Sequence, residues 1–155
     1  MSKKVINVAL LGLGTVGTGV YKVLKMQQED MEDKIGSKVE IKKILVRNLK
    51  KAAAKIEEPE LLTNNWKEIL EDESIEIVIE VMGGIEPAKT YMLEALKSGK
   101  HVVTANKDLV ASHGQEVLDC AAENGRDFLF EAAVAGGIPI IRPLKQCLAG
   151  NHLSE

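Results

Sequence analysis

The apolar residues of this chain change their spacing repeatedly along the sequence, in the order strand and then helix. Residues 5–11 form a short aliphatic run that stops at Gly12, and from Val16 the apolar residues recur at helical spacing. The pattern predicts further strands at residues 39–46, 75–81, 101–105 and 128–134. Alternating strands and helices form βαβ units, in which helices cover both faces of a parallel sheet. The predicted fold class is therefore α/β, a Rossmann-type, doubly wound parallel sheet in a single domain.

The segments between these strands vary in how clearly they predict helices. Helices are expected at residues 87–96, 109–123 and 139–148, the first and last opened by a proline and the first two followed by a glycine. Residues 66–70 predict one or two helical turns. The charged residues 27–34 are expected to be the frayed end of the first helix and a loop, and residues 48–60 a short helix or a loop.

Composition excludes several classes of protein. With 155 residues, 45% of them hydrophobic and 28% charged, the chain can bury a core and is not expected to be disordered. A net charge of -3 and only 3% aromatic residues argue against a nucleic-acid partner. No apolar run is long enough to span a bilayer, and the N-terminus does not resemble a signal peptide. Cys120 and Cys147 form no CxxC pair, so a reduced, cytoplasmic compartment is expected.

A glycine fingerprint follows the first strand. Gly12, Gly14 and Gly17 form the pattern GxGxxG, at the point where the strand gives way to a helix. The first glycine permits a tight turn, the second lets the backbone approach a pyrophosphate, and the third lets the helix pack closely on the sheet. The helix N-terminus then presents free N–H groups to the phosphates. We interpret this turn as a dinucleotide site; the alternative is a turn that is only structural.

The residue at the end of the second strand bears on the choice of cofactor. NAD-binding domains carry an acidic residue there, which accepts hydrogen bonds from the ribose hydroxyls. Here the position is held by Arg47, which would pair with a 2′-phosphate, so NADP is favoured over NAD. The alternative is that Arg47 is only a solvated charge at a strand end.

Two more residues at the expected carboxyl edge of the sheet could do chemistry. Lys107 stands near the start of a helix, where the helix dipole disfavours a cation, and it could point into the cleft or be solvated. Glu131 interrupts an apolar strand, and a buried carboxylate needs a partner. That partner could be a hard cation held with the carbonyls of residues 134–138, a helix N-terminus or a basic side chain.

Five motifs together resemble one enzyme family. They are GLGTVG (12–17), VRN (46–48), EVMGG (80–84), TANK (104–107) and EAAVAGGIPII (131–141). In this order and at these spacings, the chain resembles the N-terminal half of homoserine dehydrogenase over nearly its whole length. The resemblance implies the NAD(P)-dependent interconversion of L-homoserine and L-aspartate 4-semialdehyde, on the branch that leads to threonine, methionine and isoleucine.

The resemblance also implies roles for single residues. Cofactor contacts are expected at Gly12, Gly14, Thr15, Val16, Gly17, Arg47, Gly83, Thr104 and Lys107. Arg47 would bind the 2′-phosphate, Gly83 and Thr104 would lie on the nicotinamide side, and Lys107 would be catalytic in the active-site cleft. A structural sodium ion is expected at Glu131 and at the backbone of Val134, Gly136 and Ile138.

The same resemblance implies a domain plan. Residues 1–148 would form the NAD(P)-binding domain, and residues 149–155 would begin a hinge and a substrate-binding domain, through which the family forms homodimers. The chain is thus expected to be a fragment that binds cofactor and turns over little substrate. Two other functions are open from the residues: a Rossmann module that senses NAD(P) without catalysis, and a methyltransferase that uses S-adenosylmethionine. A methyltransferase of this kind is expected to have an acidic residue at the position of Arg47.

Overall fold

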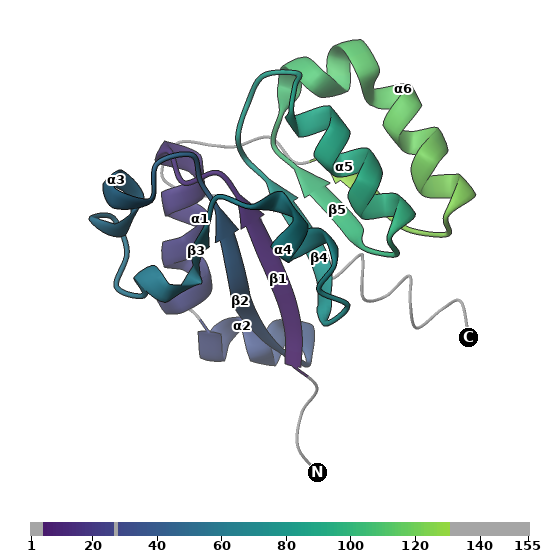
Figure 1. Ribbon diagram of the computed structural model, residues 1–155. Helices are drawn as coiled ribbons and strands as arrows, with labels where there is room; N and C mark the ends of the chain where they lie inside the picture. Colours follow the sequence, from purple (N-terminus) through teal and green to yellow (C-terminus); the bar gives the residue numbers. More distant parts are fainter. Residues whose placement is uncertain (1–4, 27, 131–155) are drawn as a thin grey trace.

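The structure is a computed structural model that describes residues 5–26 and 28–130 (Figure 1). It contains one six-stranded sheet, in which all the strand pairs are parallel. The order β3-β2-β1-β4-β5-β6 is that of a dinucleotide-binding Rossmann sheet, so the predicted fold class is confirmed. The strands are β1 (Val5–Leu11), β2 (Lys38–Leu45), β3 (Leu62–Thr63), β4 (Ile75–Glu80), β5 (His101–Thr104) and β6 (Phe128–Phe130).

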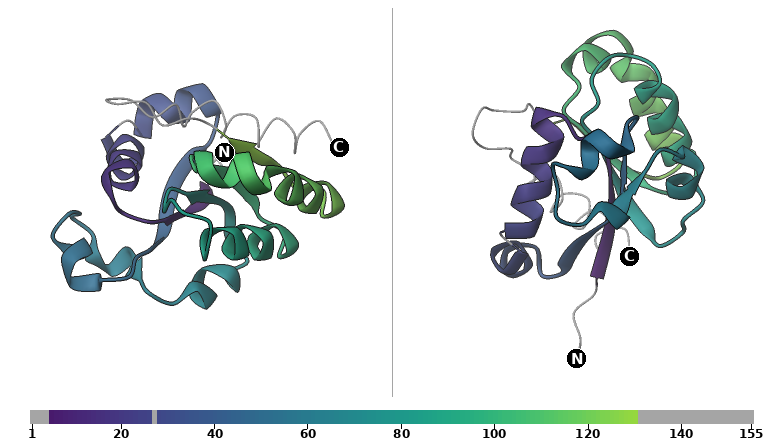
Figure 2. Two further views of the ribbon diagram at one scale, coloured as in Figure 1. Left: turned by 90° about the horizontal axis from the view of Figure 1, so that it is seen from above. Right: turned by 60° about the vertical axis from the view of Figure 1, so that its left-hand side comes forward.

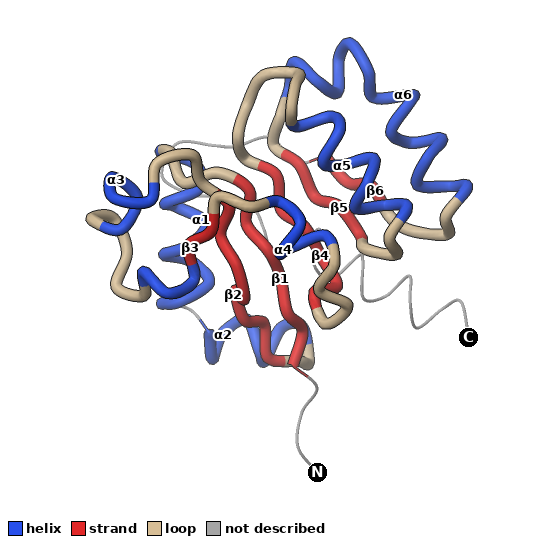
Figure 3. Tube along the Cα trace, viewed as in Figure 1, coloured by secondary structure: helices blue, strands red, loops and turns tan. Residues whose placement is uncertain are grey.

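Helices cover both faces of the sheet (Figures 2 and 3). They are α1 (Thr15–Met26), α2 (Gln28–Ile35), α3 (Leu49–Ala53), α4 (Trp66–Leu70), α5 (Ala88–Lys97) and α6 (Lys107–Glu123), with a 3-10 turn, η1 (Pro59–Leu61). Successive residues of β1 point to opposite faces. Val8 and Leu10 pack in the core beneath α1, whereas Ala9 and Leu11 pack in the core beneath α4, α5 and α6. The side chains of β1 are thus buried on both faces, as expected of a central parallel strand.

Most predicted elements lie within one or two residues of their observed bounds, and the exceptions are short or charged. Residues 28–35 form α2 rather than the expected loop, helped by Glu29 and Asp30, whose charges suit the first turn of a helix. The two-residue strand β3 was not predicted, because two residues carry no periodicity. Helix α6 begins at Lys107, two residues earlier than expected, because the Asn106 side chain accepts a hydrogen bond from Leu109 N and caps it.

Several sequence predictions lie outside the described residues. They concern the rest of the strand at 128–134, the helix at 139–148, the domain boundary at residue 149, and the sodium residues Glu131, Val134, Gly136 and Ile138. Within residues 5–26 and 28–130, no helix is both long and apolar enough to cross a bilayer. No cluster of three or more His, Cys, Asp or Glu side chains in the same segments is arranged to hold a metal ion.

The carboxyl ends of the strands are aligned in register across the sheet. Leu11 pairs with Leu45 on one side and with Glu80 on the other, and Glu80 pairs in turn with Thr104. The loops that follow β2, β1, β4 and β5 therefore leave the sheet along one line. The order of the strands reverses between β1 and β4, and ligands of such sheets bind outside the carboxyl ends at this position.

Candidate functional site

Gly12 makes the turn at the end of β1. Its φ of +103° lies in the region that favours glycine, and its N–H donates to the Leu45 carbonyl over 2.9 Å. A Cβ at this position would lie 3.1 Å from the Cα of Met82, in the loop after β4. The turn therefore brings three loops of the sheet edge close together, and only glycine fits there without strain.

The other two glycines of the fingerprint differ in what their surroundings demand. A Cβ on Gly17 would lie 2.3 Å from the carbonyl oxygen of Gly12, so the close approach of α1 to the turn requires glycine. A Cβ on Gly14 would meet nothing within 4 Å, and Gly14 has no positive φ. Packing within the fold thus explains why positions 12 and 17 are glycines, but it does not explain Gly14. Gly14 directly precedes α1 and faces open space.

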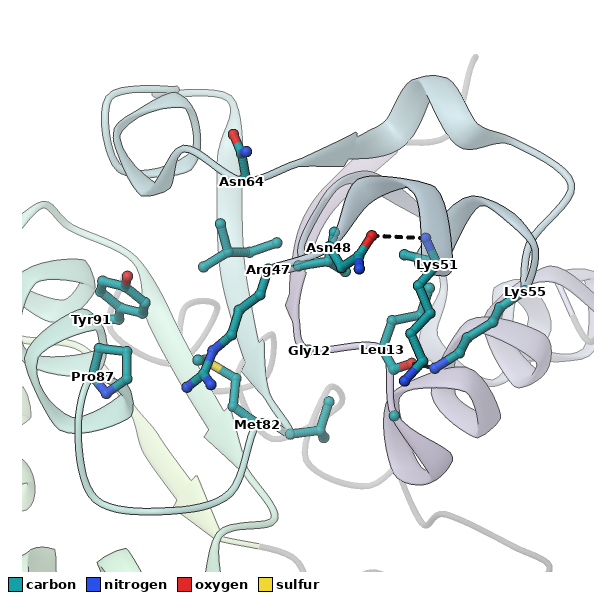
Figure 4. Close-up of a pocket in the computed structure, with 15 residues that line it drawn as sticks. Gly12, Leu13, Arg47, Asn48, Lys51, Lys55, Asn64, Met82, Pro87 and Tyr91 are labelled. Carbon is teal, nitrogen blue, oxygen red and sulfur yellow. Dashed lines mark hydrogen bonds between the residues drawn. The ribbon is translucent and has the colours of Figure 1, made fainter.

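A cavity of about 690 Å³ lies in front of this turn (Figure 4). It is bounded by the glycine turn, the loop after β2, the loop after β4 and the start of α5. The residues that line it are Gly12, Leu13, Gly14, Leu45, Val46, Arg47, Asn48, Lys51, Ala52, Lys55, Asn64, Val81, Met82, Pro87 and Tyr91. Among the described residues that line it, three side chains are basic and none is acidic, so the cavity favours an anionic ligand.

The three cations are Arg47 after β2, Lys51 in α3 and Lys55 in the turn that follows α3. Arg47 extends across the cavity toward Met82 and Pro87 in Figure 4. Lys55 lies by the glycine turn, where its Nζ donates to the Leu13 carbonyl over 2.8 Å. Sequence analysis assigned a role to Arg47 alone and missed Lys51 and Lys55. Lys51 lies four residues after Arg47 and Lys55 lies eight after it, and this regular spacing of cations behind a strand is the signal that could have found them.

A second, more open cavity of about 530 Å³ adjoins the first on the outer side of α1. Gly14 and Lys55 line both cavities, and Thr15 and Lys22 line the second. Of the predicted cofactor residues, Gly12, Gly14 and Arg47 are therefore in the larger cavity and Thr15 in the smaller one. Val16 is half-buried in the first turn of α1.

The aromatic end of the larger cavity is held rigidly. The ring of Tyr91 stacks on that of Trp66, with the ring centroids 4.5 Å apart. Trp66 in turn donates from its indole nitrogen to Glu94 over 2.8 Å. Because Tyr91 lines the cavity and Trp66 supports it, this wall presents a fixed apolar surface, of the kind against which a flat ring can pack.

The sequence-predicted residues on the nicotinamide side lie on the neighbouring loops and do not line either cavity. Gly83 is exposed, with a φ of +78°, in the loop after β4. Thr104 ends β5 with 1% exposure, and its hydroxyl donates to the Glu80 carboxylate. Lys107 is the exposed first residue of α6, beside Asp108. All three lie along the aligned carboxyl edge, at or just after the ends of β4 and β5.

Glu80 is a residue at this edge that sequence analysis did not single out. It is the last residue of β4 and has no exposed surface. Its carboxylate accepts hydrogen bonds from the backbone N–H groups of Met82 and Gly83, from the Thr104 side chain at the end of β5, and from the Asn106 side chain in the loop that follows. The signal was present in the sequence, because a carboxylate inside an apolar strand needs a partner, the argument applied to Glu131.

Comparison with known proteins identifies the family of this chain. The family profile described as "Homoserine dehydrogenase, NAD binding domain" matches residues 12–131, which include the glycine turn and all the loops of the carboxyl edge described above. The chain belongs to the homoserine dehydrogenase family. The resemblance drawn from the sequence motifs is thereby confirmed.

Individual relatives agree with this assignment. Homoserine dehydrogenase of Bacillus subtilis is 47% identical over 152 residues, which cover 98% of this chain and 35% of that protein. The crystal structure of a homoserine dehydrogenase from Thiobacillus denitrificans has a TM-score of 0.81 at 46% identity, covering 91% of this chain and 32% of that one. A structure described as a hyperthermophilic archaeal homoserine dehydrogenase in complex with NADPH has a TM-score of 0.67 at 26% identity. The match covers 94% of this chain and 50% of that one. This chain thus spans about a third of the length of its bacterial relatives.

Proposed function

We propose that this chain is the cofactor-binding part of an enzyme that interconverts L-homoserine and L-aspartate 4-semialdehyde by hydride transfer with NADP(H). The observation that carries the proposal is the glycine turn of a homoserine dehydrogenase domain, at the switch point of the sheet, facing a cationic cavity. The substrate would be a small molecule, and the hydride chemistry is supplied by the cofactor when it is bound. The residues of this chain bind that cofactor and orient it.

The residues around the turn fit a pyrophosphate. Gly14 leaves open space where a side chain would otherwise stand, and α1 begins at Thr15 directly behind it. The first N–H groups of a helix have no partner within the helix, and the dipole favours an anion there. Gly12 and Gly17 would hold the turn in shape, and Thr15 and Val16 would contribute backbone N–H groups.

The cavity supports NADP rather than NAD. A 2′-phosphate adds a dianionic group beside the adenine ribose, and Arg47 follows β2 at the place where NAD-binding domains carry an acidic residue. Lys51 lines the same cavity, and the part of the chain that the structure describes brings no carboxylate to the lining that would repel the phosphate. The archaeal relative described as a complex with NADPH supports the same choice. We assign the 2′-phosphate to Arg47, with Lys51 as a second cation.

The nicotinamide would lie toward β4 and β5, against the bare backbone of Gly83 and near Thr104. Lys107 is exposed beside this position, so its ammonium is free to approach the substrate oxygen. A cation there stabilises the negative charge that develops on that oxygen during hydride transfer. We therefore assign Lys107 to the active-site cleft.

Other parts of the proposal rest on the sequence resemblance. They are a structural sodium ion at Glu131, Val134, Gly136 and Ile138, a cytoplasmic location, and a role in threonine, methionine and isoleucine biosynthesis. A homodimer formed through a substrate-binding domain, in the full-length enzyme, belongs to the same group. The choice of sodium is supported by the ligand types, because carboxylates and backbone carbonyls are oxygen ligands of the kind that hard cations prefer.

Calorimetric titration of this chain with NADPH and with NADH tests the cofactor assignment. We expect NADPH to bind more tightly, and Arg47→Ala to remove that preference while it leaves NADH binding little changed. Lys50→Ala is the matched control, because Lys50 is a neighbouring exposed cation that does not line the cavity. Equal affinity for both cofactors would be consistent with a dehydrogenase but would show that Arg47 does not bind the 2′-phosphate. Binding of S-adenosylmethionine instead of either would contradict the proposal.

A further inference from the structure

The Glu80 carboxylate gathers hydrogen bonds from two separate loops. The backbone N–H groups of Met82 and Gly83 donate to its Oε2 over 2.9 and 3.2 Å. The Asn106 side-chain amide donates to the same oxygen over 3.4 Å, and the Thr104 hydroxyl donates to Oε1. One carboxylate therefore joins the loop after β4 to the loop after β5.

This carboxylate is fully buried, which decides how it can act. Burying an ionised carboxylate is costly unless hydrogen bonds replace those it made to water. The donors that the structure shows are amide and hydroxyl groups, and charge-assisted bonds of this kind are among the stronger ones in proteins. With no exposed surface, Glu80 does not touch a ligand in the cleft. Any effect on function must pass through the groups that it holds.

The groups that Glu80 holds lie at the nicotinamide side of the site. Gly83 and Gly84 both adopt positive φ, and the Asn106 amide also donates to the Gly84 carbonyl over 2.6 Å. Asn106, which directly precedes Lys107, also caps α6: its side-chain oxygen accepts a hydrogen bond from the backbone N–H of Leu109. The glycine loop and the start of α6 are thus fixed to each other and to the end of β4. Within residues 5–26 and 28–130, the side chains of Arg47, Lys51 and Lys55 on the adenine side make no hydrogen bond to Glu80, Thr104 or Asn106.

We propose that Glu80 is a positioning residue for the nicotinamide half of the cofactor site, an inference that rests on the proposed function. It holds the Met82–Gly84 backbone and the first turn of α6 in the arrangement in which nicotinamide binds. Loss of its charge loosens both loops but leaves the glycine turn and the adenine half intact. Glu80 therefore affects binding of the whole cofactor and not binding of its adenosine half.

Two probes separate these halves: NADPH, and adenosine 2′,5′-bisphosphate, which lacks the pyrophosphate-linked nicotinamide. We expect Glu80→Gln to weaken NADPH binding about tenfold, the scale of one charge-assisted hydrogen bond. The same variant should change the affinity for the bisphosphate less than about twofold, a change within the range of unrelated surface effects. Asp72→Asn is the matched control, since this carboxylate precedes β4 at the opposite end of the strand and should alter neither affinity.

A second pair of variants keeps the test decisive if Glu80→Gln does not fold. Thr104→Val removes the hydroxyl that donates to Glu80, and Thr104→Ser retains one. We expect Thr104→Val to weaken NADPH binding severalfold and Thr104→Ser to bind NADPH as the unaltered chain does, with the affinity for the bisphosphate unchanged in both variants. Unchanged NADPH binding in Glu80→Gln and Thr104→Val would overturn the inference, as would an equal loss for both probes, which indicates a general role in stability. Failure of the unaltered chain to bind NADPH overturns the proposed function first, and this inference with it.

Discussion

The variants Gly14→Ala and Gly17→Ala make a matched pair, because the same methyl group is added in open space at one position and in a crowded place at the other. At Gly17 the new Cβ would lie 2.3 Å from the Gly12 carbonyl oxygen and 2.9 Å from its carbon, so the turn or α1 must shift. At Gly14 the Cβ enters open space. We therefore expect Gly17→Ala to damage the fold and Gly14→Ala to damage only the binding of the cofactor.

The size of each effect follows from these contacts. Overpacking costs about 1–3 kcal/mol, and we take the upper end at Gly17 because a backbone carbonyl cannot rotate away. Alanine gains about 1 kcal/mol over glycine inside a helix, which leaves a net loss of about 2 kcal/mol. For a chain of this size that lowers the melting temperature by about 4–8 °C. Gly14→Ala should cost about 1 kcal/mol or less, the scale of a change just before a helix.

Thermal unfolding by circular dichroism measures the first effect, and calorimetric titration with NADPH measures the second. We expect Gly14→Ala to melt close to the unaltered chain and to lose NADPH affinity at least about tenfold, because the methyl group occupies the space of a phosphate oxygen. The reasoning is refuted if Gly14→Ala binds NADPH normally, or if Gly17→Ala melts as the unaltered chain does.

Three further outcomes are expected. In the full-length enzyme, Lys107→Ala should lower the turnover rate far more than the affinity for cofactor, and steady-state kinetics with unchanged turnover would contradict the role of Lys107. Burial alone would raise the pKa of Asp72, but the hydrogen bonds it accepts, foremost from Lys42, outweigh this and lower it to about 2. This pKa lies below the value of 3.8 for a free carboxyl, so the ionised Asp72 stabilises the fold above about pH 4. The contribution is lost as the pH falls toward about 2. The free energy of unfolding in urea should therefore depend less on pH in that window for Asp72→Asn than for the unaltered chain. NADPH should quench the emission of Trp66, the single tryptophan, because reduced nicotinamide absorbs where tryptophan emits and Trp66 stacks on Tyr91, which lines the cavity. A titration with no quenching would place the cofactor elsewhere.

The main strands could be predicted from the sequence because each has an apolar run or an alternation of apolar and polar residues. The predicted range of β1, residues 5–11, agrees with the structure, and the glycine directly after it marks its carboxyl end. The pattern of α2 was harder to recognise, because its residues are mostly charged and its apolar face is small. The strand β3 is fixed by pairing with β2 through Leu62 and Thr63, a long-range contact that leaves no local signal.

The candidate site was predicted unevenly, for physical reasons. Gly12, Gly17 and Arg47 follow from rules about strand ends and turns, which act locally. Glu80 depends on donors from two loops that come together only when β4 and β5 pair. Its hydrogen bonds were therefore visible in the structure and not in the motif EVMGG, although the cost of burying its carboxylate was visible in both.

The most direct test of the central claim is a map of backbone amide shifts in the nuclear magnetic resonance spectrum of this chain as NADPH is added. The account predicts that the largest shifts fall on residues 12–17, on Arg47 and Asn48, and on Met82 and Gly83, which follow three neighbouring strands at one edge of the sheet. The amino-terminal edge, at residues 72–75, should show no shifts. Shifts confined to that opposite edge, or none at saturating NADPH, would contradict the claim that this edge is a dinucleotide site.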